Sequence, residues 1–157
     1  MQTATPDVSG AAGHPAPGTG LRTLLTGTSS DAHTWNLVYL RLLLSEWGHY
    51  VTTLGPCVPE SLLVAEALRL RPDLIVVSSV NGHGATDALR LITAVRQVRR
   101  LADVPVVIGG KLGTAGRSGT DWAPRLRAAG FSAVFDEDAG MPPFRGYVDA
   151  LTAGVCR

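Results

Sequence analysis

Leu74-Ile75-Val76-Val77 is the stretch of sequence that decides the fold. The run is apolar throughout, which leaves no polar face, and such a run is typical of the buried centre of a parallel sheet. Pro72, just before it, ends the helical pattern that precedes the run. The sequence therefore predicts a central strand that is covered on both faces.

Short apolar runs and helical patterns alternate on both sides of this strand. The other expected strands are Leu21–Gly27, Tyr50–Leu54, Val104–Ile108 and Ala133–Phe135. The expected helices are Trp35–Trp47, Pro59–Leu70, Ala85–Leu101, Asp121–Ala129 and Pro143–Leu151. This alternation predicts an α/β fold with a doubly wound, five-stranded parallel sheet. Right-handed crossovers favour the flavodoxin-like (Rossmann-like) strand order 2-1-3-4-5 at this chain length.

The chain of 157 residues is predicted to form one folded domain, residues 21–157, behind a polar tail. Residues 1–20 hold almost no large apolar side chains, so we expect them to be a disordered N-terminal tail. An apolar fraction of 45% and a charged fraction of 17% are ordinary for a globular protein. The net charge of +1 gives no basis for attraction to nucleic acid or to a membrane surface.

The sequence carries no signal for a membrane or an oxidising compartment. No apolar stretch is long enough to span a bilayer, and the N-terminus does not resemble a secretory signal. Cys57 and Cys156 lie far apart and in no CxxC motif, which does not support a thiol-type zinc site. We therefore expect a cytoplasmic protein with reduced thiols.

Segments of small and polar residues follow the first, third and fourth expected strands. They are Thr28–His33, Ser78–Gly84 and Gly109–Gly116. Ligands of such sheets bind outside the carboxyl ends of the strands, so the segments are predicted to line one crevice. Its walls would be backbone, hydroxyls and glycines, which let a large ligand approach the main chain but do not suit a tight apolar pocket.

Asp31 and His33 give the first segment a chemical role. A histidine on this loop can bind a metal through one ring nitrogen while the carboxylate accepts the N–H of the other. The alternative is a polar loop in which Asp31 caps the following helix. The pair alone leaves both interpretations open, and the neighbouring loops favour metal ligation.

Two other classes of protein with this fold match the sequences of these loops less well. A phosphoreceiver needs a carboxylate at the end of the third strand, where this chain has Ser78, and an acidic pair after the first, where only Asp31 is available. A flavin mononucleotide carrier could use Thr26–Ser30 as a phosphate loop. The loops after the third and fourth strands, however, hold no Trp or Tyr before Trp122.

The loops resemble those of the cobalamin (B12)-binding domain family. Asp31–Asn36 resembles the family's D-x-H-x-x-G motif, Ser78–Gly82 its S-x-L/V segment, and Gly109-Gly110 its later G-G. The resemblance covers roughly residues 21–151 and is greatest to the small (sigma) subunits of glutamate mutase, also called methylaspartate mutase. One departure is Asn36, which stands where the motif has glycine and could narrow the slot for the cofactor's nucleotide tail.

The resemblance implies that adenosylcobalamin is the cofactor and that His33 is the axial ligand of its cobalt. Asp31 would accept the N–H of His33, and the nucleotide tail would lie beside the sheet. The implied cofactor-binding residues are Ser30, Asp31, Ala32, His33, Thr34, Asn36, Ser78, Ser79, Val80, Gly82, Gly109, Gly110, Lys111, Leu112 and Gly113. The resemblance implies no catalytic side chain in this chain.

The resemblance also implies the role of one subunit of an adenosylcobalamin-dependent carbon-skeleton mutase, an isomerase, that is inactive alone. A larger barrel-fold subunit would bind the substrate, and glutamate mutase converts L-glutamate to 3-methylaspartate by a radical rearrangement. One alternative is a corrinoid methyl-carrier protein, which usually has a helical cap for which residues 1–20 are too short and polar. The other is a non-catalytic B12-fold binding or regulatory module, an alternative that Asn36 keeps open.

Overall fold

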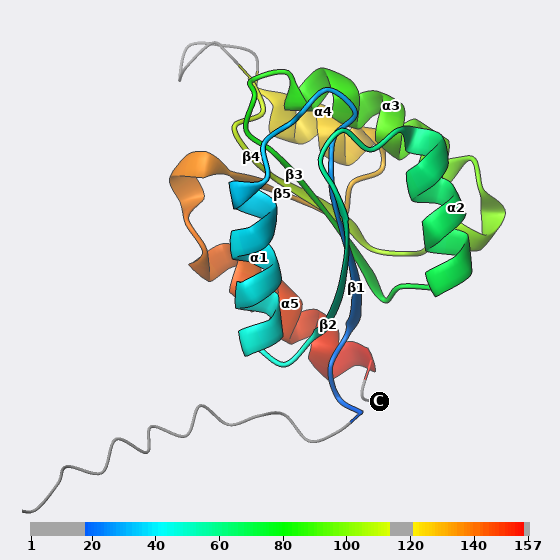
Figure 1. The fold of residues 1–157 in the computed structure, drawn as a ribbon, viewed down its shortest axis with the longest axis vertical. Coiled ribbons are helices and arrows are strands. Elements are labelled where there is room, and N and C mark those ends of the chain that lie inside the picture. The colour runs from blue at the N-terminus through cyan, green and yellow to red at the C-terminus, as the bar shows by residue number, and fades with distance from the viewer. Residues whose placement is uncertain (1–17, 114–120, 156–157) are drawn as a thin grey trace, which may run out of the picture.

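A parallel sheet stands at the centre of the computed structural model, which describes residues 18–113 and 121–155 (Figure 1). The strands are β1 Arg22–Gly27, β2 Tyr50–Gly55, β3 Leu74–Ser79, β4 Val106–Gly110 and β5 Ala133–Asp136. The helices are α1 Trp35–Glu46, α2 Glu60–Leu70, α3 Gly84–Arg96, α4 Trp122–Ala129 and α5 Pro142–Val155. Short 3-10 helices occur at Arg99–Leu101 and Glu137–Ala139. Most of the predicted N-terminal tail, residues 1–17, lies outside the described residues.

The five strands are parallel and in the order β2-β1-β3-β4-β5, so the predicted fold class and strand order are confirmed. At the carboxyl ends of the strands, Gly27 pairs with Ser78, and Ser78 pairs with Gly109. This register brings the loops that follow β1, β3 and β4 to one edge of the sheet. The candidate site lies at that edge.

The central strand β3 is buried on both faces, as its apolar sequence predicts. Ile75 and Val77 pack in the core under α2, α3 and α4, whereas Leu74 and Val76 pack in the core under α1 and α5. The alternation follows from the opposite directions of successive side chains on a strand. Figure 1 shows the same two layers, with α1 and α5 on one face of the sheet. Within the described ranges, no helix is long and apolar enough to cross a lipid bilayer.

Helix α3 ends earlier than the predicted end at Leu101, and a 3-10 turn follows it. The helix breaks at Val98, whose backbone is extended with φ −91° and ψ 109°, and the guanidinium of Arg96 stabilises the chain that follows by donating to carbonyl oxygens beyond the end of α3. The acceptors are the carbonyl groups of Leu101, Ala102, Val104 and Gly130. These bonds turn the chain back toward β4 and tie α3 to the start of β5.

Candidate functional site

Asp31 is buried in the β1–α1 loop, and hydrogen-bond donors surround its carboxylate. Oδ1 accepts the backbone N–H of His33 at 2.9 Å and lies 2.7 Å from Nδ1 of the same residue. Oδ2 accepts the hydroxyl of Ser79 at 2.9 Å and the N–H of Val80 at 2.6 Å. One carboxylate therefore joins the loops that follow β1 and β3.

Burial by itself raises the pKa of Asp31, but the hydrogen bonds outweigh it. The N–H groups of His33 and Val80 and the side chains of His33 and Ser79 together hold the pKa of Asp31 below its usual value. The group is thus an ionised acceptor at neutral pH. An acceptor at this position selects the tautomer of His33 that carries its hydrogen on Nδ1, which leaves the lone pair of Nε2 free.

The His33 ring is 60% exposed, and its Nε2 has no hydrogen-bond partner among the described residues. A ring held by a buried carboxylate and open at its other nitrogen has the chemistry of a metal ligand. The described parts of the chain contain no group of three or more His, Cys, Asp or Glu that could hold a metal ion.

Asp31 does not cap helix α1 in the structure. The N-cap of α1 is Thr34, which makes no side-chain capping bond, and the carboxylate oxygens of Asp31 bind His33, Ser79 and Val80 instead. Ala32 and Thr34, the neighbours of His33, are both exposed. The loop is thus built to hold the His33 ring and not to begin the helix.

The β3–α3 loop turns back toward the site through Gly82. Its φ of 82° lies in the left-handed region that favours glycine, and it places Asn81 beside the β1–α1 loop. Asn81 accepts the N–H of His83 at 2.9 Å and donates to the hydroxyl of Ser30 at 3.1 Å. The predicted residues Ser30, Asp31, Ser79 and Val80 are therefore brought together with His33 in one hydrogen-bonded group.

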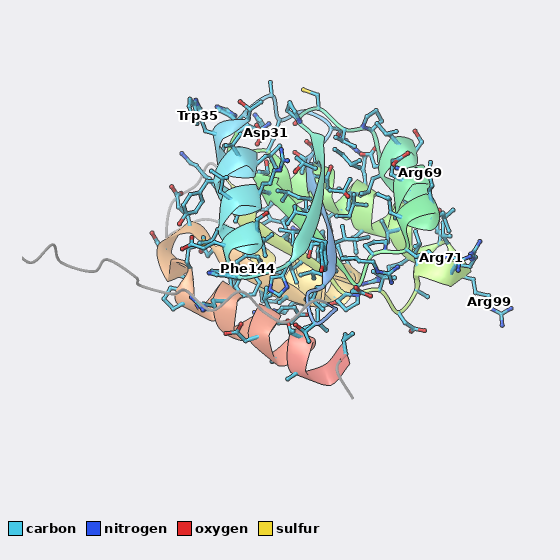
Figure 2. The ribbon with its side chains drawn as sticks, turned by 60° about the horizontal axis from the view of Figure 1, so that its bottom comes forward. Asp31, Trp35, Arg69, Arg71, Arg99 and Phe144 are labelled. Carbon is cyan, nitrogen blue, oxygen red and sulfur yellow. The ribbon has the colours of Figure 1, made fainter. Side chains whose placement is uncertain are left out.

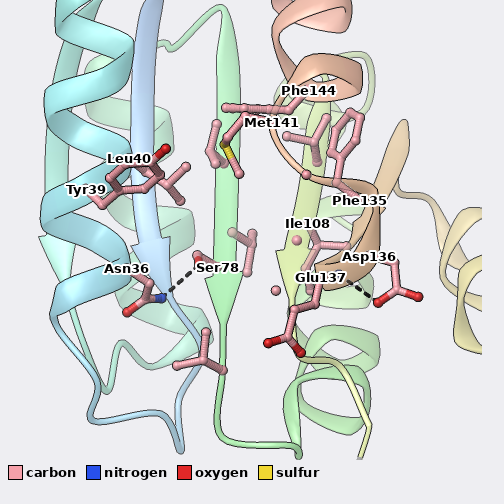
Figure 3. A pocket seen from close by; sticks show the side chains of 17 residues that line it. Asn36, Tyr39, Leu40, Ser78, Ile108, Phe135, Asp136, Glu137, Met141 and Phe144 are labelled. Carbon is pink, nitrogen blue, oxygen red and sulfur yellow. Dashed lines mark hydrogen bonds between the residues drawn. The ribbon is translucent and has the colours of Figure 1, made fainter. Parts of the chain in front are cut away.

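A cavity of about 200 Å³ adjoins this group, between α1 and the carboxyl ends of β3, β4 and β5 (Figure 3). Five predicted cofactor-binding residues line it: Asn36, Ser78, Val80, Gly109 and Gly110. Asn36 donates from Nδ2 to the hydroxyl of Ser78 at 2.8 Å. Its Oδ1 is buried without a hydrogen-bond partner in the described part of the chain, so an acceptor is left over at this wall.

The walls of the cavity are more apolar than predicted. Besides Asp136 and Glu137, the lining includes Tyr39, Leu40, Phe135, Met141 and Phe144. The expectation that the site does not suit an apolar pocket was wrong, because apolar side chains of α1, α5 and the strands β3, β4 and β5 supply much of the lining. Tyr39 and Leu40 follow Asn36 by three and four positions, a helical spacing that could have indicated them.

The third predicted loop points partly away from the cavity. Lys111 is exposed, but Leu112 is buried in the core under α2, α3 and α4, and its carbonyl accepts the N–H of Ala85. Gly113 lies against the ring of Trp122, since a Cβ there would come within 3.0 Å of the indole Nε1. The end of the predicted segment, residues 114–116, lies outside the described residues. A cofactor-binding role for Lys111, Leu112 and Gly113 stays a prediction.

An exposed apolar stripe starts beside the His33 loop. Figure 2 shows Asp31 and Trp35 at the same end of α1, and Trp35 is 83% exposed. Val38, Tyr39 and Leu42 are exposed on the same helix. Their spacing is that of one helix face, so α1 carries an apolar surface on its outer side as well as on the side that packs on the sheet.

Comparison with known proteins identifies the family. A family model described as "B12 binding domain" matches residues 21–136, which run from β1 to the end of β5. The glutamate mutase sigma subunit of Escherichia coli O157:H7 is 30% identical over 114 residues, which cover 72% of this chain and 76% of that protein. The sigma subunit of Fusobacterium nucleatum is 27% identical over 106 residues, covering 68% of this chain and 77% of that protein.

A transcriptional repressor is also similar. The HTH-type transcriptional repressor CarA of Myxococcus xanthus is 33% identical over 96 residues, or 61% of this chain. This chain spans about a third of the repressor's length, at 32%.

Solved structures share the fold. The monomethylamine corrinoid protein of Methanosarcina barkeri has a TM-score of 0.65 at 17% identity, over 84% of this chain and 58% of that chain. The receiver domain of the Francisella response regulator 1452 has a TM-score of 0.63 at 13% identity, over 87% of this chain and 99% of that chain. At these identities the likeness concerns the fold alone, whereas the family model covers every strand and the loops after β1 and β3. The chain belongs to the B12-binding domain family.

Proposed function

We propose that this chain is the cobalamin-binding subunit of an adenosylcobalamin-dependent carbon-skeleton mutase, with the conversion of L-glutamate to 3-methylaspartate as the first candidate reaction. It would act in the cytoplasm, together with a separate and larger barrel-fold subunit. The observation that carries the proposal is the state of His33. Its Nδ1 is held 2.7 Å from the buried carboxylate of Asp31, its ring is 60% exposed, and no described residue bonds to its Nε2.

These residues fit a corrinoid. His33 would be the axial ligand of cobalt, and the hydrogen bond to Asp31 would orient the ring and raise its basicity. One protein ligand is enough, because the macrocycle brings its own nitrogen ligands. When bound, adenosylcobalamin supplies radical chemistry through its cobalt–carbon bond. The protein would hold the imidazole ring of His33, keep its tautomer fixed and bind the cofactor.

The cavity beside α1 is the proposed place for the nucleotide tail. Ser78, Gly109 and Gly110 lie on its lining, as the resemblance implies for residues that contact the tail. The aromatic side chains of Phe135 and Phe144 suit a planar base. Asn36 contributes an acceptor, Oδ1, that no described residue binds, to the same wall.

The apolar stripe on α1 supports a protein partner. Exposed apolar patches mark interaction surfaces, and this one begins two residues after His33. A cofactor bound at His33 would lie at the open edge of the sheet, where a second subunit can reach it. We therefore propose that the substrate site belongs to the larger subunit and that the cofactor lies between the two chains.

A cobalamin-responsive regulatory module is the second candidate. The similarity to the CarA repressor favours it, at 33% identity over 61% of this chain. The two candidates share the cofactor site and differ in whether a catalytic partner is needed. The corrinoid proteins share only the fold, at 17–20% identity, and add nothing specific to the methyl-carrier alternative.

The cofactor site is tested by titrating the purified chain with hydroxocobalamin and adenosylcobalamin and recording the absorption spectrum. We expect the wild type to give the spectrum of histidine-ligated cobalt. We expect His33→Ala to bind more weakly and to lose that spectrum, because the imidazole nitrogen that would ligate cobalt is removed. An unchanged spectrum in His33→Ala would overturn the assignment of the ligand.

The mutase role is tested by mixing the loaded chain with a candidate large subunit and L-glutamate. Formation of 3-methylaspartate by the mixture, and by neither chain alone, supports the mutase. Turnover by the pure chain contradicts the division of labour. A cobalamin-dependent change of oligomeric state without turnover in any mixture supports the regulatory candidate instead.

A further inference from the structure

Asp87 is a buried carboxylate that the proposed ligand set does not use. It lies in the first turn of α3 and is 4% exposed. Its Oδ2 accepts both the backbone N–H of Ser30, at 3.2 Å, and the hydroxyl of Ser30. Its Oδ1 accepts from Arg90 at 2.6 Å. A carboxylate from one helix therefore holds the residue that directly precedes Asp31.

We propose that Asp87 is a positioning residue for the cobalt ligand. By holding the backbone and the hydroxyl of Ser30, it sets where Asp31 lies and, through Asp31, where the ring of His33 points. The inference rests on the proposed function, since this position matters for binding only if His33 ligates cobalt.

The hydroxyl of Ser30 is fixed from two sides. It donates to Asp87 and accepts from Nδ2 of Asn81 at 3.1 Å. Asn81 belongs to the β3–α3 loop, whereas Asp87 belongs to α3. A hydroxyl whose hydrogen and lone pair are both engaged cannot rotate freely. Ser30 thus locks the β1–α1 loop to both of these elements.

The loop has other contacts as well, and one of them joins the carbonyl of Asp31 to the N–H of Cys57 at 2.9 Å. The hydroxyl of Ser29 lies 3.4 Å from Glu60 and 3.5 Å from Arg90. The N–H of Asp31 donates to the carbonyl of Thr28 at 3.2 Å, which holds the loop only to itself. The bonds to Asp87 are therefore the main tie between α3 and the residue ahead of Asp31.

The chemistry of this contact requires a carboxylate. Ser30 presents two donors to Asp87, its N–H and its hydroxyl, and Arg90 presents a third. Asparagine at position 87 would keep one acceptor oxygen and turn its NH₂ group toward a donor. Arg90 also lies 3.6 Å from Glu60, so this cation offsets the charge of both carboxylates.

The test compares Asp87→Asn and Ser30→Ala with a matched control, Asp73→Asn. Asp73 makes the same kind of contact near the amino ends of the strands, accepting the N–H of Arg22 at 2.8 Å and its guanidinium. Binding is measured by absorption titration with hydroxocobalamin, and folding by thermal unfolding followed by circular dichroism. In the cofactor-free protein, ¹⁵N NMR of the His33 Nδ1–H reports the bond to Asp31.

We expect Asp87→Asn and Ser30→Ala to weaken hydroxocobalamin binding about tenfold or more, the usual effect of losing an outer-shell contact. We also expect both to broaden or shift the Nδ1–H signal of His33. Asp73→Asn should lose a comparable amount of thermal stability and keep both the affinity and the signal. Ser30→Thr keeps the hydroxyl and should restore binding.

Wild-type affinity and spectrum in folded Asp87→Asn would overturn the proposal, and so would an equal loss of affinity in Asp73→Asn. If even the wild type fails to bind hydroxocobalamin, the proposed function fails. The NMR comparison then decides the role of Asp87 by itself. An unchanged Nδ1–H signal in Asp87→Asn overturns the positioning role, and a lost signal supports it.

Discussion

Asn36 donates a hydrogen bond of 2.8 Å from Nδ2 to the hydroxyl of Ser78, and this contact joins α1 to the end of β3 across the cavity wall (Figure 3). The motif that the β1–α1 loop resembles has glycine at this position, so we expect the amide side chain to take up space in the slot for the cofactor. Its Oδ1 is buried and has no partner among the described residues. Asn36 therefore places an unusual polar side chain on the cavity wall, with its amide nitrogen bound to Ser78.

Asn36→Gly should bind hydroxocobalamin more tightly than the wild type, because it removes a side chain and an unpaired acceptor from the cavity wall. The same change should lower the free energy of unfolding by about 1 kcal/mol, since glycine is a poor helix former and α1 loses its tie to β3. Ser78→Ala is the control that breaks the hydrogen bond and keeps the side chain of Asn36. Unchanged affinity in Asn36→Gly would mean that Asn36 does not restrict the cofactor.

Asp31→Asn should lower the affinity for hydroxocobalamin by about 10- to 100-fold, the usual range for a lost outer-shell carboxylate. The variant should also lose about 1–3 kcal/mol of stability, because an NH₂ group would face the donors of Ser79 and Val80. Ser79→Ala removes one of these donors and leaves the bond to His33, so its effect on binding should be smaller. Equal binding losses in the two variants would contradict the role given to the carboxylate.

The sheet could be predicted from the sequence because each of its strands is a local pattern. Leu74–Val77 is apolar throughout, and its neighbours follow at the spacing of α/β units. The predicted end of α3 at Leu101 is too late, because local periodicity continues past Arg96 while the backbone becomes extended at Val98. The bond from Arg96 to the carbonyl of Gly130 ties this turn to a distant part of the chain, and no local pattern encodes it.

Some contacts of the candidate site could be predicted from the sequence, and others depend on the tertiary fold. Asp31 and His33 are two residues apart, so their contact could be predicted from local spacing. The bonds from Ser79 and Val80 depend on β3 lying beside β1 in one register. The aromatic wall at Phe144 depends on how α5 packs on the sheet, which no local pattern encodes.

Stability should fall as the pH drops through the range in which histidine titrates, because His49 is buried. Burial lowers the pKa of His49, and the charge of Asp149 only partly opposes this. The unfolded chain therefore binds a proton more readily than the folded one. The contribution of His49 is complete above the unfolded histidine pKa of about 6.5 and is lost as the pH falls below it toward the lower folded pKa. Urea unfolding between pH 5 and 8 measures this loss.

His49→Gln is the control for that measurement. The imidazole Nδ1 accepts the N–H of Leu21 at 3.1 Å, and a glutamine oxygen could accept the same bond without titrating. The variant should therefore show a shallower decrease of stability between pH 7 and 5 than the wild type. Parallel curves for the two proteins would assign the pH dependence to other groups.

Gly110→Ala should destabilise the protein and weaken cobalamin binding together. Gly110 has a φ of 107°, which side chains rarely adopt, and a Cβ there would lie 2.1 Å from the carbonyl oxygen of Ser79. The clash would push β4 away from the end of β3 and disturb the bond from Ser79 to Asp31. Gly146→Ala in α5 meets open space, so it should be neutral or stabilising by about 0.5–1 kcal/mol. Thermal unfolding and hydroxocobalamin titration of both variants measure the effects, and a stable Gly110→Ala that binds like the wild type would show that the end of β4 can move without disturbing the His33 loop.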